Sequence, residues 1–414
     1  MTPHRILLLA ATTGYQTRMF EEAARDLGIE VVLAIDRCVH LEGPWGGDAV
    51  PIRFDEPEQA AALLAQVVPR PDGIVAVGDK PSEIAALTAK ALGLCFHPHE
   101  AVLSSRNKYL ARERFREAGL PVPEYFRMGL HCDAPEFARS ARYPCVLKPL
   151  GLSGSRGVIR ADDETDFCEA VERIRALLRA PEIRRTREDH NEFIQVETYI
   201  PGREFAVEGI VTGGVLQALA IFDKPDPLEG PFFEETVYVT PSRESKDVQA
   251  QLTKATQDGV RALGLTDGPV HAEMRYNEGG VWLLEIAARP IGGLCAASLR
   301  FTGAVKLEEL ILRHAVGEDI SGLRREALAS GVMMIPIPAS GIYNGVSGVE
   351  EAAKCADDIV ITAMPGQRLL ALPEGASYLG FIFARGAKAE QVESALRKAH
   401  SKLKFDIATE LPLV

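Results

Sequence analysis

A glycine- and serine-rich stretch that follows a lysine-bearing apolar run is the first part of this sequence able to do chemistry. Residues 146–149 (Val-Leu-Lys-Pro) precede residues 151–157 (Gly-Leu-Ser-Gly-Ser-Arg-Gly). Glycines let backbone N–H groups approach phosphate oxygens, Ser153 and Ser155 add hydroxyl donors, and Lys148 can supply a positive charge. Because glycine-rich loops are common and no Gly-Lys-Ser/Thr follows, a flexible surface loop is the alternative to phosphate binding.

Two glutamates on neighbouring predicted strands are the second candidate. Residues 270–276 and 281–286 are predicted to pair around a turn at 277–280, so Glu273 and Glu285 can lie on one face of a sheet. Together with phosphate oxygens, two carboxylates are suitable ligands for a hard divalent cation. Glu285 lies in an apolar run, where an unpaired carboxylate is costly to bury, and an exposed sheet edge is the alternative.

An arginine and two further glutamates complete the candidates. Arg289 follows Glu285 by four residues and opens the segment Arg-Pro-Ile-Gly-Gly that ends at residue 293. Its planar guanidinium can bind a carboxylate with two hydrogen bonds, and a salt bridge that fixes the loop is the alternative role. Glu197 and Glu204 flank a Pro-Gly turn, for which a solvated hairpin is the simpler interpretation.

Composition and charge exclude several classes of function. The 414 residues carry a net charge of −12 and no basic stripe, which argues against nucleic-acid binding. No apolar run approaches the roughly 18 residues of a membrane helix. The seven cysteines are widely spaced without a C-x-x-C pair, which argues against zinc and disulfides and favours a reducing cytoplasm. His97 and His99 lack a third ligand nearby, so we interpret them as loop residues.

The first hundred residues are expected to form a parallel α/β domain. Apolar strands at 5–11, 30–35 and 73–77 alternate with helical patterns at 17–27, 58–67 and 82–92. This alternation is typical of a parallel sheet covered by helices on both faces. Loops at 12–15 and 78–81 follow two of these strands, at the edge where open α/β sheets bind ligands. No G-x-G-x-x-G motif is present, which argues against a dinucleotide site.

The rest of the chain is expected to form two further domains. One helix is predicted over 104–118, loops over 181–192 and 223–242, and the latter contains four prolines, as functional lids often do. From residue 331 the pattern changes to short strands and one helix. We therefore predict a multidomain protein of the α/β and α+β classes. Its expected parts are an α/β domain (1–100), a middle domain (101–330) with a lid subdomain (about 122–200), and an α+β domain (331–414).

In their order along residues 1 to about 330, these clusters resemble the ATP-grasp superfamily. The resemblance rests on several motifs that recur in sequence. They are Arg106-Asn-Lys108, Ala-Gly-Leu-Pro-Val-Pro at 118–123, Leu147-Lys-Pro149, the loop 151–157, the segment from Glu197 to Glu204, His271-Ala-Glu273, and Leu284-Glu-Ile286 through Gly293. The shorter segment 378–386, with the helix that follows, is similar to the C-terminal domain of bacterial L-amino-acid ligases. An ATP-grasp fold is expected, with an N-terminal parallel-sheet domain and a C-terminal α+β domain.

The resemblance implies a role for each nucleotide-binding residue. Lys108 and Lys148 would hold the α- and β-phosphates of ATP, and the loop ending at Gly157 would close over the β- and γ-phosphates. Glu197 and the backbone at Ile200 would meet the adenine edge, and Glu204 would meet the ribose hydroxyls. The residues implied to bind ATP are Lys108, Lys148, Ser153, Ser155, Gly157, Glu197, Ile200 and Glu204.

The resemblance also implies a metal site and a reacting centre. Glu273 and Glu285 would hold Mg²⁺, with Mn²⁺ as an alternative ion, and Arg289 would face the substrate carboxylate and the acyl phosphate. The family often has Asn two residues after the second metal glutamate, whereas this sequence has Ala287. The number of protein ligands for a second ion is therefore open.

The expected function is that of an ATP-dependent, ADP-forming ligase that activates a carboxylate as an acyl phosphate and joins it to an amine. A peptide or amide bond between amino acids is the expected product, with small molecules as partners, a cytoplasmic location and a homodimer as the default oligomer. A biotin-carboxylase-like enzyme is one alternative, although polar and acidic residues expected after the metal strand are replaced by Pro-Ile-Gly-Gly at 290–293. A catalytically silent nucleotide-binding module is the other alternative. The joint presence of Lys108, Lys148, Glu273, Glu285 and Arg289 speaks against it.

Overall fold

A four-stranded parallel sheet forms the N-terminal part of the computed structural model, which describes residues 3–11, 14–36 and 49–409. Its elements are β1 (Arg5–Ala10), α1 (Tyr15–Leu27), β2 (Glu30–Ile35), β3 (Ala49–Pro51), α2 (Pro57–Leu64), β4 (Gly73–Val77) and α3 (Asp79–Leu92), with the strand order β3-β2-β1-β4. Leu7 and Leu9 share a core with α2 and α3, whereas Ile6 and Leu8 share one with α1 and with α10 (Leu307–Ala315). The prediction of a parallel sheet covered on both faces is confirmed.

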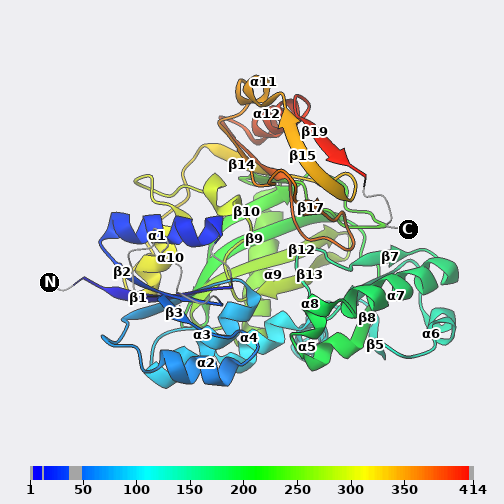
Figure 1. Ribbon diagram of the computed structural model, residues 1–414, viewed down its shortest axis with the longest axis horizontal. Helices are drawn as coiled ribbons and strands as arrows, with labels where there is room; N and C mark the ends of the chain where they lie inside the picture. The colour runs from blue at the N-terminus through cyan, green and yellow to red at the C-terminus, as the bar shows by residue number, and fades with distance from the viewer. Residues whose placement is uncertain (1–2, 12–13, 37–48, 410–414) are drawn as a thin grey trace.

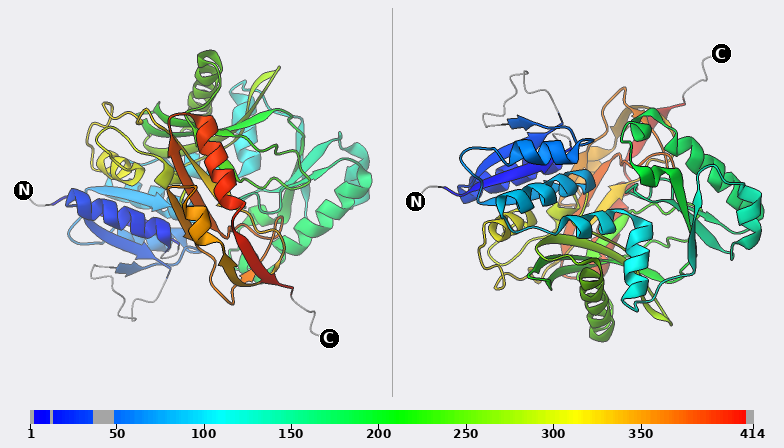
Figure 2. Two further views of the ribbon diagram at one scale, coloured as in Figure 1. Left: turned by 90° about the horizontal axis from the view of Figure 1, so that it is seen from above. Right: turned by 90° about the horizontal axis from the view of Figure 1, so that it is seen from below.

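An eight-stranded sheet forms the centre of the molecule (Figure 1). Its strands are β9 (Arg203–Thr212), β10 (Val215–Lys224), β11 (Val237–Thr240), β12 (Gly268–Asn277), β13 (Gly280–Ala287), β14 (Ala329–Ile335), β16 (Asp358–Ile361) and β18 (Gly380–Gly386). They follow the order β13-β12-β9-β10-β11-β14-β18-β16. Helix α9 (Lys246–Leu263) packs closely on β13, because a Cβ at Gly259 would lie 2.5 Å from Ile286. Helix α12 (Ala389–His400) covers β14 and β18 at the other end (Figure 2).

A smaller antiparallel sheet lies on the side of the large sheet opposite the N-terminal sheet (Figure 1). It consists of β5 (Tyr125–Gly129), β6 (Cys145–Pro149), β7 (Ile159–Ala161) and β8 (Phe193–Thr198), in the order β5-β8-β6-β7. Helices α6 (Ala134–Ser140) and α7 (Glu164–Leu178) share its hydrophobic core. These elements fall within the range expected for a lid, and the division of the chain into domains stays a prediction.

The C-terminal region contributes to two sheets. Strands β14, β16 and β18 extend the large sheet across the expected boundary at residue 331, whereas β15 (Gly341–Ser347), β17 (Arg368–Leu369) and β19 (Lys404–Ala408) form a separate sheet. A short helix, α11 (Val349–Ala353), lies beside α12. None of the helices in the described part of the chain has the length and apolar content needed to cross a membrane.

Four local predictions were wrong. Residues 104–118 form two helices, α4 (His99–Arg106) and α5 (Lys108–Glu117), because the Asn107 side chain caps α5 by accepting hydrogen bonds from its first turn. The expected loop 78–81 contains the start of α3, and 223–242 contains the end of β10 and all of β11. Part of 181–192 is helical, in α8 (Pro181–Arg184) and a 3₁₀ turn (Asp189–Glu192). The loop expected at 12–15 includes residues 12 and 13, which lie outside the described residues.

Candidate active site

A cavity of about 470 Å³ lies where the small sheet, the large sheet and the C-terminal region meet. Of the site residues predicted from the sequence, all but Gly157 line it. They are Lys108, Lys148, Ser153, Ser155, Glu197, Ile200, Glu204, Glu273, Glu285 and Arg289. Residues separated by up to about 180 positions in the chain thus surround one space, although their roles stay predictions.

The two predicted phosphate-binding lysines enter the cavity from different elements. Lys108 opens α5, and its Nζ donates to the Leu152 carbonyl at 2.7 Å and lies 3.5 Å from a Glu285 carboxylate oxygen. Lys148 lies on β6, and its Nζ is 2.5 Å from a Glu197 carboxylate oxygen. Burial lowers the pKa of Lys148, although the charge of Glu197 opposes this shift. Both ammonium groups are held near the glycine- and serine-rich loop.

The Glu197 carboxylate is committed to buried ion pairs. Its oxygens accept hydrogen bonds from Lys148 and, at 2.7 Å, from Arg112 Nε, and the Glu197 side chain is only 2% exposed. Burial alone would raise the pKa of Glu197, but Arg112 and Lys148 outweigh it and hold the pKa at about 2. The carboxylate therefore stays charged and orients Lys148, and its contact with an adenine edge stays a prediction.

Glu204 and the backbone of Ile200 are joined through one arginine. Arg275 Nε donates to Glu204 at 2.9 Å, and Arg275 Nη1 donates to the Ile200 carbonyl at 2.7 Å. The Arg275 guanidinium also lies 5.0 Å from the ring centre of Tyr199, which stacks on Phe233 at 6.3 Å. This end of the cavity combines flat aromatic surfaces with backbone and carboxylate acceptors, which suits a planar heterocycle and hydroxyl groups.

Glu273 and Glu285 lie directly opposite each other on β12 and β13, so they share a face of the sheet as the sequence predicted. A register irregularity follows Glu273, between it and Met274. Glu273 lies 3.4 Å from Lys224 Nζ, and Glu285 faces Lys108. Antiparallel pairing brings both carboxylates to one face because directly opposed side chains point the same way. Oxygen donors of this kind suit a hard divalent cation.

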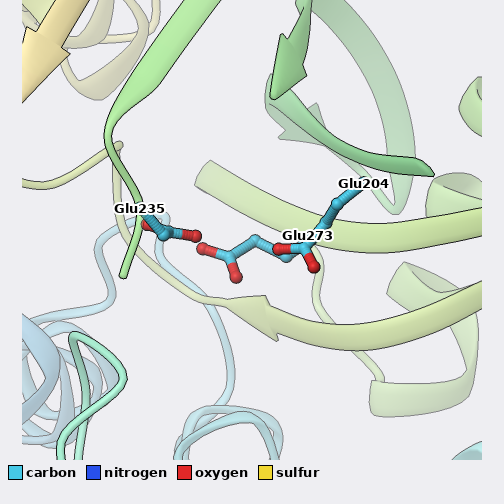
Figure 3. Close-up of side chains that lie close together, drawn as sticks. All are labelled: Glu204, Glu235 and Glu273. Carbon is cyan, nitrogen blue, oxygen red and sulfur yellow. The ribbon is translucent and has the colours of Figure 1, made fainter. Parts of the chain in front are cut away.

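A second group of carboxylates surrounds a lysine that the sequence analysis missed. Oxygens of Glu204, Glu235 and Glu273 all lie within 4.8 Å of one another (Figure 3). Lys224 Nζ lies 2.9 Å from Glu204 and also bonds Glu235. Burial and the neighbouring charge of Glu273 raise the pKa of Glu235 to about 7. The sequence offered one signal for this site, a lysine at the end of an apolar strand just before Pro225. Only the fold brings Glu235 close to that lysine.

Arg289 lines the cavity and also forms an ion pair with the N-terminal domain. Its Nε donates to Asp79 Oδ1 at 2.8 Å, and its Nη1 donates to the Pro290 carbonyl at 3.1 Å. Burial works against the charge of Asp79, yet the adjacent Arg289 lowers the pKa of that carboxyl. The salt bridge considered from the sequence is present, and the guanidinium still borders the cavity. Its contact with a substrate carboxylate stays a prediction.

The glycine- and serine-rich loop has two parts. Ser153, Gly154 and Ser155 line the cavity, whereas Gly157 lies behind it and donates its N–H to the Pro373 carbonyl at 2.8 Å. Gly157 has φ = 73°, and a Cβ there would lie 2.7 Å from Pro149. Its glycine is thus needed for backbone conformation and close packing against β6.

A buried glutamate and histidine connect the metal strand to the Arg289 loop. Glu208 accepts from the Ile291 N–H at 3.1 Å and lies 3.0 Å from His271 Nδ1. The other His271 nitrogen is 3.3 Å from Glu273. Although burial opposes protonation, the two glutamates raise the pKa of His271 to about 9. From the sequence, His271 was named only as a neighbour of Glu273, and Glu208 was given no role.

Comparison with known proteins agrees with this geometry. Residues 141–298 match the family model of the ATP-grasp domain, and residues 333–408 match that of the L-amino acid ligase C-terminal domain 2. The crystal structure of an L-amino acid ligase from Bacillus licheniformis superposes with a TM-score of 0.83 at 25% identity, covering 99% of this chain and 100% of that one. The expected fold is confirmed.

Two curated relatives are, by name, a synthase and a ligase. Dapdiamide A synthase of Enterobacter agglomerans is 28% identical over 296 residues, which are 67% of this chain and 66% of the relative. D-alanine–D-alanine ligase of Acinetobacter baylyi is 25% identical over 232 residues, which are 54% of this chain and 66% of the relative. The chain therefore spans just under two thirds of the length of each.

Proposed function

We infer the activity from the premise that this chain belongs to the ATP-grasp superfamily and carries a C-terminal domain of the L-amino acid ligase type. We propose an ATP-dependent, ADP-forming carboxylate–amine ligase that joins two amino acids through a peptide or amide bond. One observation carries the proposal: Lys108, Lys148, the opposed pair Glu273 and Glu285, and Arg289 border a single cavity. Phosphoryl transfer needs this combination of positive charge, metal ligands and positioning more than it needs a covalent catalyst.

The nucleotide would occupy the end of the cavity formed by the two sheets. Tyr199 and Phe233 offer flat surfaces for adenine, and Glu197 and the Ile200 backbone lie on the same side. Glu204 would meet the ribose hydroxyls. Lys108 and Lys148 would bind the phosphates together with Ser153 and Ser155, which line the same cavity.

Mg²⁺, or Mn²⁺ in its place, fits the carboxylates that face the phosphate region. Glu273 and Glu285 are the ligands we assign, and Glu235 and Glu204 lie close enough to Glu273 to support its position. The ion would neutralise charge on the transferring phosphoryl group. Lys224 pairs with Glu204 and Glu273. These carboxylates would therefore have a cationic partner both with and without the metal ion.

The reaction follows in two steps. A carboxylate oxygen attacks the γ-phosphorus of ATP, the bond to the β-phosphate oxygen breaks, and ADP leaves. The amine nitrogen of the second substrate then attacks the acyl carbon, phosphate departs with the bonding electrons, and the nitrogen loses a proton. Arg289 would hold the carboxylate and then the acyl phosphate through the guanidinium N–H groups that remain after Nε donates to Asp79 and Nη1 donates to the Pro290 carbonyl.

The substrate end of the cavity favours uncharged side chains. The residues that α1, the 292–295 segment and the C-terminal region contribute to the described lining carry no formal charge; they are Tyr15, Gly292, Gly293, Cys295, Met334, Thr362, Gln367, Ala376, Ser377 and Tyr378. An unpaired charge buried there would be costly. We therefore propose that at least one substrate is an amino acid with an uncharged side chain, and we expect a cytoplasmic enzyme, with a homodimer as the default.

An ADP-release assay with mixtures of amino acids tests the proposal. The purified protein with Mg²⁺ and ATP should release ADP only when amino acids are present, and mass spectrometry should detect a dipeptide in equal amount. Release that depends on bicarbonate instead would support the carboxylase-like alternative. Nucleotide binding without any release of ADP would support the silent module and contradict the proposal.

A further inference from the structure

A segment of the C-terminal region holds the glycine- and serine-rich loop in place. The Gly157 N–H donates to the Pro373 carbonyl at 2.8 Å, and Arg156 Nε donates to the Glu374 carbonyl, also at 2.8 Å. The loop and this segment are more than 200 residues apart in the sequence. Both hydrogen bonds use the backbone of residues 373 and 374, so the segment fixes the end of the loop that carries Arg156 and Gly157.

The Glu374 side chain makes a second connection, to helix α7 of the small sheet. Arg173 donates from Nε and Nη2 to Glu374 Oε1 at 2.9 and 2.8 Å, and from Nη2 to Oε2 at 3.0 Å. The Arg173 guanidinium also lies 4.9 Å from the ring centre of Phe232. A single exposed ion pair contributes little to stability, but a forked arginine contact restricts orientation. Arg173 thus joins α7, residue 232 and the C-terminal segment.

The same segment borders the cavity a few residues later. Ala376, Ser377 and Tyr378 line it together with Ser153, Gly154 and Ser155. A Cβ placed on Gly154 would lie 3.4 Å from the Ala376 Cβ, so the loop passes within one methyl group of the segment. Residues 373–378 therefore connect the phosphate loop, on one side, with the uncharged substrate end on the other.

We propose that Glu374 is a positioning residue that, through Arg173, keeps the glycine- and serine-rich loop closed over the acyl phosphate. This inference rests on the proposed ligase function and concerns how that site is protected. If the loop opens early, water attacks the acyl phosphate, the acid and inorganic phosphate are released, and the net reaction is ATP hydrolysis without amide formation. Exclusion of water is therefore what Glu374 contributes, because an open lid exposes the intermediate.

The coupling ratio, ADP released per amide formed, tests this role. In Glu374→Gln we expect the ratio to rise by roughly twofold or more and the KM for ATP to rise by a smaller factor. Lys108 and Lys148 keep their phosphate contacts, and only the loop that carries Ser153 and Ser155 is loosened. Glu318→Gln is the matched control, since Glu318 pairs with Arg313 at 2.9 Å on a comparably exposed surface. Combining Arg173→Glu with Glu374→Arg should restore a ratio near that of the wild type. An unchanged ratio in Glu374→Gln would overturn the proposal.

Hydrogen exchange separates this inference from the proposed function. Without substrates, amides of residues 151–157 should exchange faster in Glu374→Gln than in the wild type and in Glu318→Gln. Faster exchange in a protein that forms no amide from the twenty amino acids would support the role of Glu374 in holding the loop and refute the ligase assignment. Exchange at the wild-type rate in Glu374→Gln would refute the role of Glu374 in holding the loop, whichever reaction the enzyme catalyses.

Discussion

Asp79 and Arg289, which lie 210 positions apart in the chain, form a 2.8 Å hydrogen-bonded ion pair at the edge of the cavity. Asp79 is the first residue of α3, and Arg289 follows the end of β13. The pair therefore connects the N-terminal parallel sheet to the strand that carries Glu285. It also aligns the guanidinium, because a donor fixed through Nε leaves little freedom for the rest of its plane.

Replacement of this arginine tests its place at the reacting centre. Arg289→Lys should keep binding of an ATP analogue but cut amine-dependent ADP release tenfold or more, about 1.4 kcal/mol of transition-state stabilisation. Lysine retains the charge and loses the planar fork. Calorimetric titration with the analogue, run beside the ADP-release assay, gives both quantities.

Asp79→Asn is the control for a purely structural role. It removes the charge of the partner and keeps the guanidinium. If Arg289 only anchors its loop, both variants should lower the melting temperature and the turnover rate equally. A much larger loss of turnover in Arg289→Lys than in Asp79→Asn supports the catalytic role, and wild-type turnover in Arg289→Lys rules it out.

Glu285→Gln tests the metal site. The substitution preserves shape and removes a negative charge, so Mg²⁺-dependent ADP release should fall by at least about a hundredfold, the upper range for losing an outer-shell partner, with the fold intact. Titration of activity against Mg²⁺ and a thermal melt measure the two effects. Full activity at low Mg²⁺ argues against metal binding, and a large fall in melting temperature points to a structural role.

Lys224→Met tests the cation among the carboxylates. Glu204, Glu235 and Glu273 would lose their shared partner, and breaking such buried pairs costs about 3 kcal/mol or more. The variant should melt at a lower temperature than the wild type. Addition of Mg²⁺ or Mn²⁺ without nucleotide should raise the melting temperature of the variant more than that of the wild type. Lys254→Met, at an exposed lysine paired with Asp258, is the control. A variant that melts like the wild type contradicts this account.

His97 makes stability depend on pH. It is buried, and its Nε2 lies 3.2 Å from the Pro269 carbonyl. Burial lowers its pKa from 6.5 to about 4. As pH falls from 6.5 to 4, the unfolded chain binds a proton that the folded protein does not, so stability decreases by about 3 kcal/mol and no further below that range.

Denaturant unfolding at several pH values measures this contribution. The wild type should lose more stability than His97→Gln over the same interval, because glutamine takes up no proton. His131→Gln, at an exposed histidine, should keep the wild-type dependence. Parallel pH profiles for the wild type and His97→Gln would show that His97 titrates normally in the folded state.

Local sequence patterns predicted much of the fold and part of the site. The strands β2 and β4 were predicted with their observed bounds because a parallel strand buried on both faces is a continuous apolar run. The hairpin itself followed from local pattern, but its turn alone would set Glu273 opposite Leu284. The register shift between Glu273 and Met274 brings Glu273 opposite Glu285, and no local pattern showed it. The break at Asn107 was missed, since the periodic pattern on either side of a cap can read as one helix.

Long-range relationships were decided only by tertiary structure. The sequence by itself determined which residue types could bind phosphate and metal, because short motifs hold those groups at fixed local spacing. No local pattern shows the pairing of Asp79 with Arg289 or of Lys224 with Glu235. The same is true of the pairing of Arg173 with Glu374. Each joins elements whose relative placement depends on how the sheets and the C-terminal region pack, and packing is a property of the whole chain.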